Sequence, residues 1–273
     1  MRQFVLINQK GNRYSLNDSK SFMSEPSGLG FEFKVDYENY NDYFVEKGRE
    51  LKQPKIKGKI YFSSYEEYYN FMTFIQFRPL ELEYTSHKTF HMTCNVDKIG
   101  KEERTAFGKL QCPIEIVGKT PFYEKIIKKN DSIGNIGKTY PYTYPYTYAG
   151  TDTGTVEFEV ISNMESGVKM TMMGPLINPS WSYFVNGEKK LSGKINANVA
   201  SGNRLVIDTT ESPYLIHEVD SMNQLVKDRY EDSDFTTNRF IRLEKGTNVI
   251  TCTHEGTNTI SMIMEAHVNY ESV

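Results

Sequence analysis

Apolar and polar side chains alternate along most of this chain, which is the pattern of half-buried β-strands. The clearest stretch is residues 31–37, where every second residue is apolar: Phe31, Phe33, Val35 and Tyr37. Residues 89–98 and 107–117 alternate in the same way and place Cys94 and Cys112 on apolar strand faces. Short runs with frequent turn residues continue through the second half, so we expect a mainly β fold.

The first apolar run predicts a hairpin at the start of the fold. Residues Phe4–Asn8 are followed by the turn residues Gln9–Asn12 and by a second extended stretch at residues 13–16. The run has only four consecutive apolar residues and no small-residue cleavage site, so we interpret it as a strand and not as a signal peptide. No run of 18 apolar residues occurs, so we expect no membrane span.

Residues 31–62 predict a projecting β-arm. We expect strands at residues 31–37 and 51–62, joined by a polar tip at Glu38–Arg49. Basic residues outnumber acidic ones in its second half: Lys47, Arg49, Lys52, Lys55, Lys57 and Lys59. Two interpretations stay open. The lysines belong either to a solvated edge strand, where they deter aggregation, or to a contact with an acidic surface of a neighbour.

One helix is predicted after residue 63. Ser64 can cap its first turn, and Glu67 three residues later completes a capping box. Four apolar residues fall at helical spacing and form one face: Tyr68, Phe71, Met72 and Ile75. Arg78-Pro79 ends the helix, which we expect to cover a sheet.

The stretch at residues 130–154 predicts a boundary between two domains. It contains four glycines and the repeat Tyr140–Thr143, Tyr144–Thr147, in which proline at every fourth residue excludes a helix and favours an extended crossover. The formal net charge also changes, from +4 over residues 1–138 to -7 over residues 139–273. We therefore predict domains at 1–138 and 139–273.

Candidate chemistry is sparse. The three cysteines, Cys94, Cys112 and Cys252, are odd in number and lack C-x-x-C spacing, which favours reducing cytoplasm and argues against a thiolate metal site. Nucleophile-elbow, P-loop, zincin and dinucleotide-binding motifs are absent. His87 and His91 could share a strand face, but no third ligand is visible. Paired carboxylates for glycoside hydrolysis have no specific signal.

Two further features have a structural interpretation. The acidic run Glu231–Asp234 lacks the glycine and distal glutamate of a calcium loop, so we expect a solvated loop. Trp181, the single tryptophan, could offer a sugar platform, but a core position is more common for a lone tryptophan on a strand. We predict no catalytic, cofactor-binding or metal-binding residues, no cofactor, and no enzyme.

The order of these segments resembles the distal tail proteins of bacteriophages that infect Gram-positive bacteria. The matching segments, in family order, are Phe4–Asn8, Gly11, Tyr14, Leu16, Pro26–Phe31, the helix with Tyr68, Phe71 and Ile75, Lys98–Lys101, Leu110–Glu115, Thr120–Tyr123, the Tyr-Pro repeat, Gly202–Asp208 and Leu243–Ile250. The resemblance covers nearly the whole chain. Residues 212–238 fit no pattern of the family.

The resemblance implies two β-sandwich domains, the first with one helix and a projecting β-hairpin arm, the second galectin-like or jelly-roll. It implies a homo-oligomer, a hexameric ring, that joins the tube of a long non-contractile tail to the baseplate or tail tip. The implied partners are the tail tube protein, tail-associated, baseplate and receptor-binding proteins, and, weakly, saccharide. DNA would pass through without specific binding, as the net charge of -3 favours, and no membrane is a partner. The implied location is the virion tail, assembled in the host bacterial cytoplasm.

Two other functions stay open. The chain could be a pair of carbohydrate-binding modules that anchors a wall-active enzyme or an adhesin. It could also be a tail-associated hydrolase, although no nucleophile or carboxylate pair is identified. An assembled oligomer without sugar affinity favours the tail protein, and a glycan-binding monomer favours the carbohydrate-binding modules.

Overall fold

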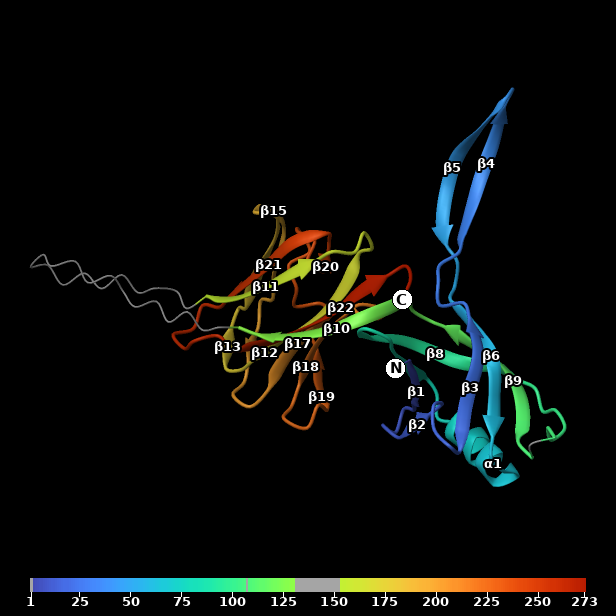
Figure 1. Cartoon of the computed structure of the whole chain (residues 1–273). Helices are drawn as coiled ribbons and strands as arrows, with labels where there is room; N and C mark the ends of the chain where they lie inside the picture. Colours follow the sequence, from blue (N-terminus) through green and yellow to red (C-terminus); the bar gives the residue numbers. More distant parts are fainter. Residues whose placement is uncertain (1, 107, 131–152) are drawn as a thin grey trace, which may run out of the picture. The chain divides into compact units, whose positions relative to one another are not determined.

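A computed structural model describes residues 2–106, 108–130 and 153–273 of the chain. These residues form two compact units (Figure 1): unit 1 comprises Met1–Glu124 with Asn269–Val273, and unit 2 comprises Lys125–Val268. The described residues hold one helix and many strands, so the predicted mainly β class is confirmed. The domain boundary predicted at residues 138 and 139 and the Tyr-Pro repeat lie outside the described residues, and both stay predictions.

Unit 1 is built on a sheet that curls around one core. Its strands lie in the order β3-β6-β9-β8-β7-β1-β2. A bridge between Asn17 and Phe22 brings the two ends of this order together. The bounds are β1 Gln3–Ile7, β2 Arg13–Ser15, β3 Ser21–Ser27, β6 Lys55–Phe62, β7 Leu80–Thr85, β8 Thr89–Ile99 and β9 Leu110–Gly118. The predicted first hairpin is confirmed, since β1 and β2 pair antiparallel.

Helix α1 (Tyr65–Phe74) begins at the predicted cap, where the Ser64 hydroxyl accepts a hydrogen bond of 3.2 Å from the Glu67 amide. The carboxylate of Glu67 lies 3.7 Å from the Lys20 ammonium. The predicted apolar face is confirmed: Phe71 is fully buried and packs between the rings of Tyr14 and Phe62, with centroid distances of 5.1 and 5.4 Å. The helix therefore covers the core of unit 1 at the end where β2 and β6 meet.

Unit 2 is a β-sandwich. One sheet contains β19-β18-β17-β12-β22, and the other has the order β11-β21-β14-β15. Cys252 Sγ on β21 lies 3.4 Å from Met170 Sδ on β12, so the inner faces of the two sheets touch. The bounds are β11 Gly154–Val160, β12 Ser166–Met173, β14 Ser180–Val185, β15 Glu188–Lys194, β17 Arg204–Asp208, β18 Leu215–Val219, β19 Leu225–Asp228, β21 Gly246–Thr253 and β22 Met262–Tyr270.

The remaining strands are short or belong to the boundary between the units. A small sheet pairs β13 (Leu176–Ile177) with β16 (Asn198–Val199), and β20 (Arg242–Leu243) pairs with β12. The chain passes from unit 1 to unit 2 within β10 (Phe122–Lys129) and returns within β22. No helix in the described ranges is long and apolar enough to cross a membrane.

Outside residues 31–62, five strands of the described residues were not predicted: β3, β10, β13, β15 and β19. Pro26 and the glycines after it suggested a breaker in the region of β3, but the register shift between Ser24 and Ser27 absorbs Pro26 at a bulge. Strand β15 is mostly charged, and all four residues of β19 are exposed, so neither shows a buried face. Edge strands of this kind carry little hydrophobic periodicity.

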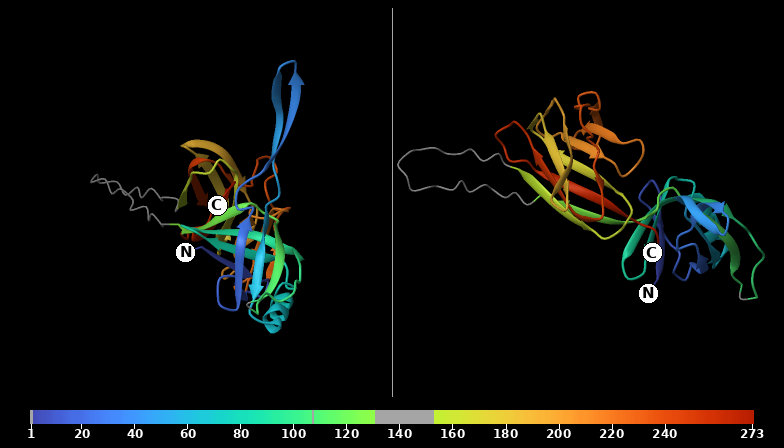
Figure 2. Two further views of the ribbon diagram at one scale, coloured as in Figure 1. Left: turned by 45° about the vertical axis from the view of Figure 1, so that its right-hand side comes forward. Right: turned by 90° about the horizontal axis from the view of Figure 1, so that it is seen from above.

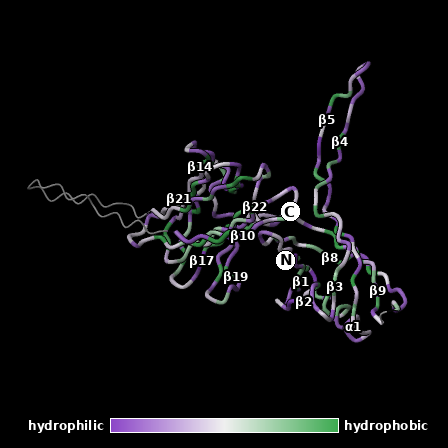
Figure 3. Tube along the Cα trace, viewed as in Figure 1, coloured by the Kyte–Doolittle hydropathy of each residue, from purple (hydrophilic) through white to green (hydrophobic). Residues whose placement is uncertain are grey.

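Hydrophobic positions nevertheless follow the strands closely. Figure 3 shows hydrophobic and hydrophilic segments alternating along both units and also along the projecting arm of unit 1. The predicted core positions are confirmed: Trp181 is 2% exposed, and Cys94 and Cys112 are fully buried. Cys252, for which no position was predicted, is also fully buried.

Candidate assembly interface

The most exposed element of unit 1 is a hairpin of β4 (Phe33–Tyr40) and β5 (Tyr43–Leu51), named here the arm. It projects from the end of β3 and β6 and pairs with no other strand among the described residues (Figures 1 and 2). Asn41 and Asp42 form its turn, and Asn41 has a φ of 53°, which asparagine tolerates better than most residues.

The arm differs from the prediction at residues 51–62. The partner of β4 is β5, whereas Lys55–Phe62 is β6, a core strand of unit 1 that pairs with β3 and β9. The predicted polar tip at Glu38–Arg49 is therefore mostly strand. Gln53-Pro54 separates the arm from β6, and the alternating pattern that continues past it belongs to a different sheet. The projecting hairpin exists, but its second strand was misplaced.

The charge of the arm also differs from the prediction. Lys55, Lys57 and Lys59 lie on the outward face of β6, and Lys52 lies at the base of the arm, where it pairs with Glu32. The arm itself, Phe33–Leu51, holds three basic and five acidic residues, a net charge of -2. The basic surface and the arm are thus separate parts of unit 1.

Both faces of the arm carry exposed apolar side chains. The register places Phe33 opposite Leu51, Val35 opposite Arg49, and Asn39 opposite Phe44, and directly opposed residues share a face. The guanidinium of Arg49 lies 4.9 Å from the Phe33 ring centroid. Several large apolar side chains of the arm are exposed: Tyr37, Tyr40, Tyr43, Phe44 and Val45. Tyr37 and Phe44 lie on one face, and Tyr40, Tyr43 and Val45 lie on the other. A two-stranded hairpin is marginal by itself in water, so these exposed side chains call for a partner.

The base of the arm is shaped by Gly28, which has a φ of +86°. A Cβ at this position would lie 1.9 Å from the Lys55 carbonyl oxygen, so any larger residue would displace the start of β6. A pocket of 730 Å³ lies beside it, with Phe31, Leu51 and Pro121 among its lining residues. Gly28 therefore allows β3 and β6 to stay close together where the arm leaves the body.

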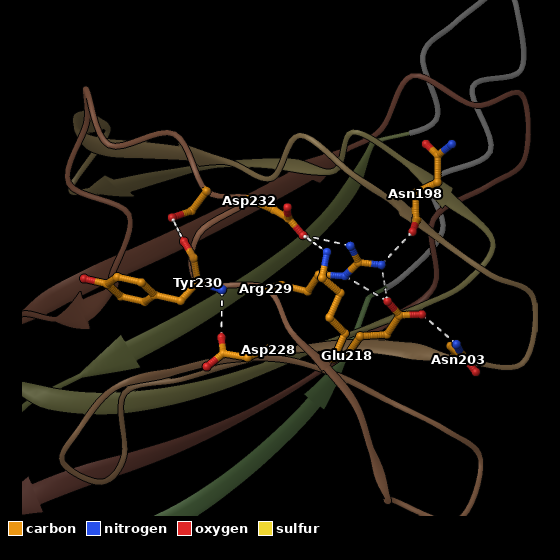
Figure 4. A network of polar contacts seen from close by, with 9 residues as sticks. Asn198, Asn203, Glu218, Asp228, Arg229, Tyr230 and Asp232 are labelled. Atoms are coloured by element: carbon orange, nitrogen blue, oxygen red, sulfur yellow. Dashed lines mark hydrogen bonds and ion pairs between the residues drawn. The ribbon is translucent and has the colours of Figure 1, made fainter.

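Unit 2 carries a polar network that the sequence did not reveal (Figure 4). Arg229 binds Glu218 through Nη2 at 2.5 Å and Asp232 through Nη1 at 2.7 Å, and Asn203 donates to the other Glu218 oxygen at 2.6 Å. Burial alone would raise the pKa of Glu218, but the hydrogen bonds from Asn203 and Arg229 and the arginine charge hold it below its ordinary value.

This network corrects the prediction for the acidic run. Asp232 is bound by Arg229 and by Lys227, and Ser233 is 4% exposed, so these two residues are not part of a solvated loop. The hydrogen bond from Arg229 lowers the pKa of Asp232. Arg229 thus holds the segment after β19 against β18. The carboxylates of Glu218 and Asp232, which could otherwise bind a cation, are occupied by this arginine.

An aromatic cluster lies next to this network. The Arg239 guanidinium lies 4.4, 4.8 and 5.2 Å from the ring centroids of Phe235, Tyr230 and Phe240. Arg239 is 8% exposed, whereas Phe235 is 59% exposed. Seven exposed large apolar residues fall between residues 214 and 235: Tyr214, Leu215, Met222, Leu225, Val226, Tyr230 and Phe235. Residues 212–238, which fit no family pattern, therefore expose many large apolar side chains.

The histidine prediction changes in one respect. The structure brings ligand atoms of Glu81, Glu83 and His91 within 4.8 Å of one another, because Glu83 and His91 are opposite each other on β7 and β8. His91 Nδ1 lies 2.6 Å from Glu81 Oε1, and Arg13 binds Glu83 at 3.0 Å. His87 contacts Ser86 and is not in this group. Hydrogen bonds to His91 and Arg13 occupy the two glutamates, and the i, i+2 spacing of the glutamates was the only sequence signal of the cluster.

The comparisons with known proteins agree with this architecture. Residues 3–119 match the family model of the distal tail protein, N-terminal domain. The fold of the chain is similar to a chain of the phage P2 baseplate in its activated conformation with calcium, at 16% identity, with 100% of both chains covered and a TM-score of 0.66. It is also similar to the Dit protein of phage SPP1, at 6% identity, with 97% of this chain and 98% of that chain covered and a TM-score of 0.63. A search among curated proteins finds no match.

Proposed function

We propose that the chain is a bacteriophage distal tail protein, a structural protein of the phage tail, and that identical copies of it close into a ring that joins the tail tube to the baseplate or tail tip. We propose six copies in the ring. Unit 1 carries the family-matched residues 3–119, so it would form the ring itself. The virion tail is then the working location of the protein.

The arm is the observation that supports ring formation most directly. It exposes Tyr43 by 74% and Phe44 by 72%, and the described part of the chain offers no strand that pairs with it. A projecting apolar hairpin on every copy can be covered by the next copy. Repeated head to tail, such a contact closes into a ring when the rotation between copies divides a full turn.

The central channel of this ring would let DNA pass without holding it. The net charge of the whole chain is -3, so strong electrostatic binding of DNA phosphates, which is driven by counterion release, is not expected. Assembly in the host bacterial cytoplasm fits the three buried cysteines. Burial raises the pKa of the Cys94 thiol to about 12 and that of Cys112 to about 11, which keeps both thiols protonated and unreactive.

Unit 2 would hold receptor-binding or other baseplate proteins. The support is the apolar surface of residues 214–235, whose exposed aromatic and aliphatic side chains lie beside the Arg229 network. Interfaces are enriched in tyrosine, phenylalanine, methionine and arginine, and a fixed backbone lowers the entropy cost of binding. The role would be purely structural, with no catalysis.

Saccharide binding is a second candidate for unit 2. The exposed rings of Tyr230 and Phe235 could hold a sugar ring, whereas Trp181 cannot because it is buried. Titration of the purified protein with host-wall glycans separates the two ideas. Saccharide affinity that is lost in Phe235→Ala would favour the carbohydrate-binding alternative, and retention of a baseplate protein without glycan affinity would favour the attachment role.

The ring is tested by shortening the arm. Replacing Tyr37–Glu46 by Asn-Gly removes the exposed tip and leaves the lower rungs of the hairpin, because Tyr37 and Glu46 are opposite each other. We expect both units to stay folded by circular dichroism, while rings are lost in electron micrographs and a phage lacking the protein is no longer complemented.

A control changes an exposed strand of unit 2 instead. Glu188, Lys189 and Lys190 lie at the start of β15 and are exposed. Replacement of these three residues by Ala should leave rings and infectivity intact. Infectious tails assembled from the arm-shortened protein would contradict the proposed function.

A further inference from the structure

The tip of the arm combines exposed aromatic side chains with one uncompensated acid. Tyr43 and Phe44 follow directly on the turn residue Asp42. Within the described ranges Asp42 makes no ion pair, whereas Glu38 and Glu46 farther down the arm are paired with Lys47 and Arg49. The tip therefore presents apolar rings next to a negative charge.

A pocket of 440 Å³ lies at the opposite end of unit 1. Its floor is one row of side chains across three strands, since Phe22 on β3 is opposite Tyr61 on β6, which is opposite Gln111 on β9. Thr105, Ala106 and Lys109 complete the lining. Phe22 is 43% exposed there, although phenylalanine on a strand is usually covered.

The charged side chain that lines this pocket is basic. Lys109 lines the pocket and makes no ion pair within the described residues. Lys55, Lys57 and Lys59 lie along the same outward face of β6 as Tyr61, because alternate residues of a strand share a face. Lys57 and Lys59 are paired with Glu115 and Glu25, at 3.8 and 3.0 Å. Lys109 is therefore the positive charge at the pocket that complements the arm, whose net charge is -2.

We propose that the arm tip of one copy of this chain inserts into the Phe22–Tyr61–Gln111 pocket of a second copy. Tyr43 and Phe44 fill the pocket, and Asp42 pairs with Lys109. The proposal deepens the ring function above, on which it rests, by naming the two surfaces that meet.

The contact has to be between copies, because an arm cannot reach its own pocket. Strand β6 is eight residues long, and Tyr61 is at the end far from the arm. Strand β4 is also eight residues long and extends away from that end (Figures 1 and 2). At about 3.3 Å per residue, tip and pocket of one chain are separated by roughly 40 Å. An arm tip and a receiving pocket at opposite ends of one unit give a head-to-tail contact between copies.

Cross-linking between two differently tagged copies tests this contact. One copy carries Tyr43→Cys and the other carries Lys109→Cys. The native cysteines are fully buried and do not interfere. Under mild oxidation we expect the mixed cross-linked dimer in at least tenfold greater yield than with a control copy carrying Lys189→Cys, an exposed position in unit 2.

Two outcomes bear on the proposal directly. Phe22→Glu in the Lys109→Cys copy should abolish the mixed dimer if the pocket receives the tip. A yield no higher than that of the Lys189→Cys control overturns the proposal.

A charge exchange provides an independent measurement. Asp42→Lys and Lys109→Glu should each reduce assembly of the full chain, measured by light scattering, and the two together should restore it. Both positions are on the surface, so neither change threatens folding. Two single variants that assemble like the wild type, or a double variant that is worse than either, contradict the pairing of Asp42 with Lys109.

The same experiments separate this inference from the ring itself. Wild-type rings together with control-level cross-linking leave the ring function standing and show that the arm docks elsewhere, for example on another tail protein. Specific cross-linking together with open chains, and no closed rings in micrographs, supports the arm contact and contradicts the ring.

Discussion

Arg229 and Glu218 show how single residues hold an exposed segment in place. Glu218 is 3% exposed, and such a carboxylate is tolerated only because Arg229 and Asn203 satisfy its oxygens. The cost of burying the charge is offset by these charge-assisted hydrogen bonds, which are stronger than neutral ones. The apolar residues 214–235 therefore start from a fixed base and not from a mobile loop.

We expect Glu218→Gln to destabilise unit 2 by roughly 1–3 kcal/mol at pH 7. The pKa of Glu218 is lowered in the folded state, so its contribution is present above the unfolded-state pKa of about 4.3 and is lost as pH falls through the folded value. The gap between wild type and variant should therefore shrink in acid. Urea unfolding at pH 7 and at lower pH measures it.

The control for that change is Glu231→Gln at an exposed neighbouring position, with an expected effect below about 0.5 kcal/mol. If Glu218→Gln lowers the free energy of unfolding by the same amount at both pH values, the charge of the Glu218 carboxylate does not stabilise the network.

Phe71 is the residue of α1 on which the unit 1 core depends most. It is fully buried against Tyr14 and Phe62, so Phe71→Ala should cost about 3–5 kcal/mol through the cavity it leaves. Glu66→Ala, on the exposed side of the same helix, should cost less than about 0.5 kcal/mol. Equal effects in chemical denaturation would mean that the buried face of α1 is assigned wrongly.

At the scale of elements, α1 depends on a cap and the arm on a turn. Because the arm does not share the sheet of unit 1, shortening it should leave the stability of unit 1 nearly unchanged. The helix, by contrast, begins where Ser64 satisfies the Glu67 amide, one of the amide groups that lack a partner in the first turn.

Ser64→Ala should destabilise unit 1 by about 1 kcal/mol, because the Glu67 amide loses its acceptor. The preceding residue is a matched control, since Ser63 is exposed and precedes the cap. Ser63→Ala should have an effect within about 0.5 kcal/mol. Thermal unfolding of the two variants decides the matter, and a larger loss at Ser63 would place the helix start one residue earlier.

At the scale of the whole molecule, each unit has its own core and its own buried thiol reporter. Cys94 and Cys112 lie in unit 1, and Cys252 lies in unit 2. All three should label slowly in the native protein, because burial raises the pKa of each thiol. In Phe71→Ala we expect faster labelling of Cys94 and Cys112 in mild denaturant, with Cys252 unchanged.

Mass spectrometry of the labelled peptides reads the three sites separately. Acceleration at Cys252 equal to that at Cys94 would show that the two units unfold as one. Rapid labelling of any of the three in the native wild type would contradict the burial of that strand face.

The sequence by itself determined many of the elements with a buried side. Alternation at residues 89–98 and 107–117, the capped helix at Ser64 and the β1–β2 turn were all predictable, because one face of each is pressed into a core and every second or third residue must be apolar. The family resemblance rested on the order of the same elements. The family match confirms it for residues 3–119, and over the rest of the chain the fold is similar to that of a phage baseplate protein.

Only the tertiary structure decided which strand pairs with which, and that decided the candidate interface. Local alternation is identical in an arm strand and in a core strand, so Lys55–Phe62 was assigned to the arm although β6 lies between β3 and β9. The separation of an acidic arm from a basic face, and the row of Phe22, Tyr61 and Gln111, depend on cross-strand register. Register is fixed by long-range pairing between residues tens of positions apart, and periodicity along the chain carries no information about it.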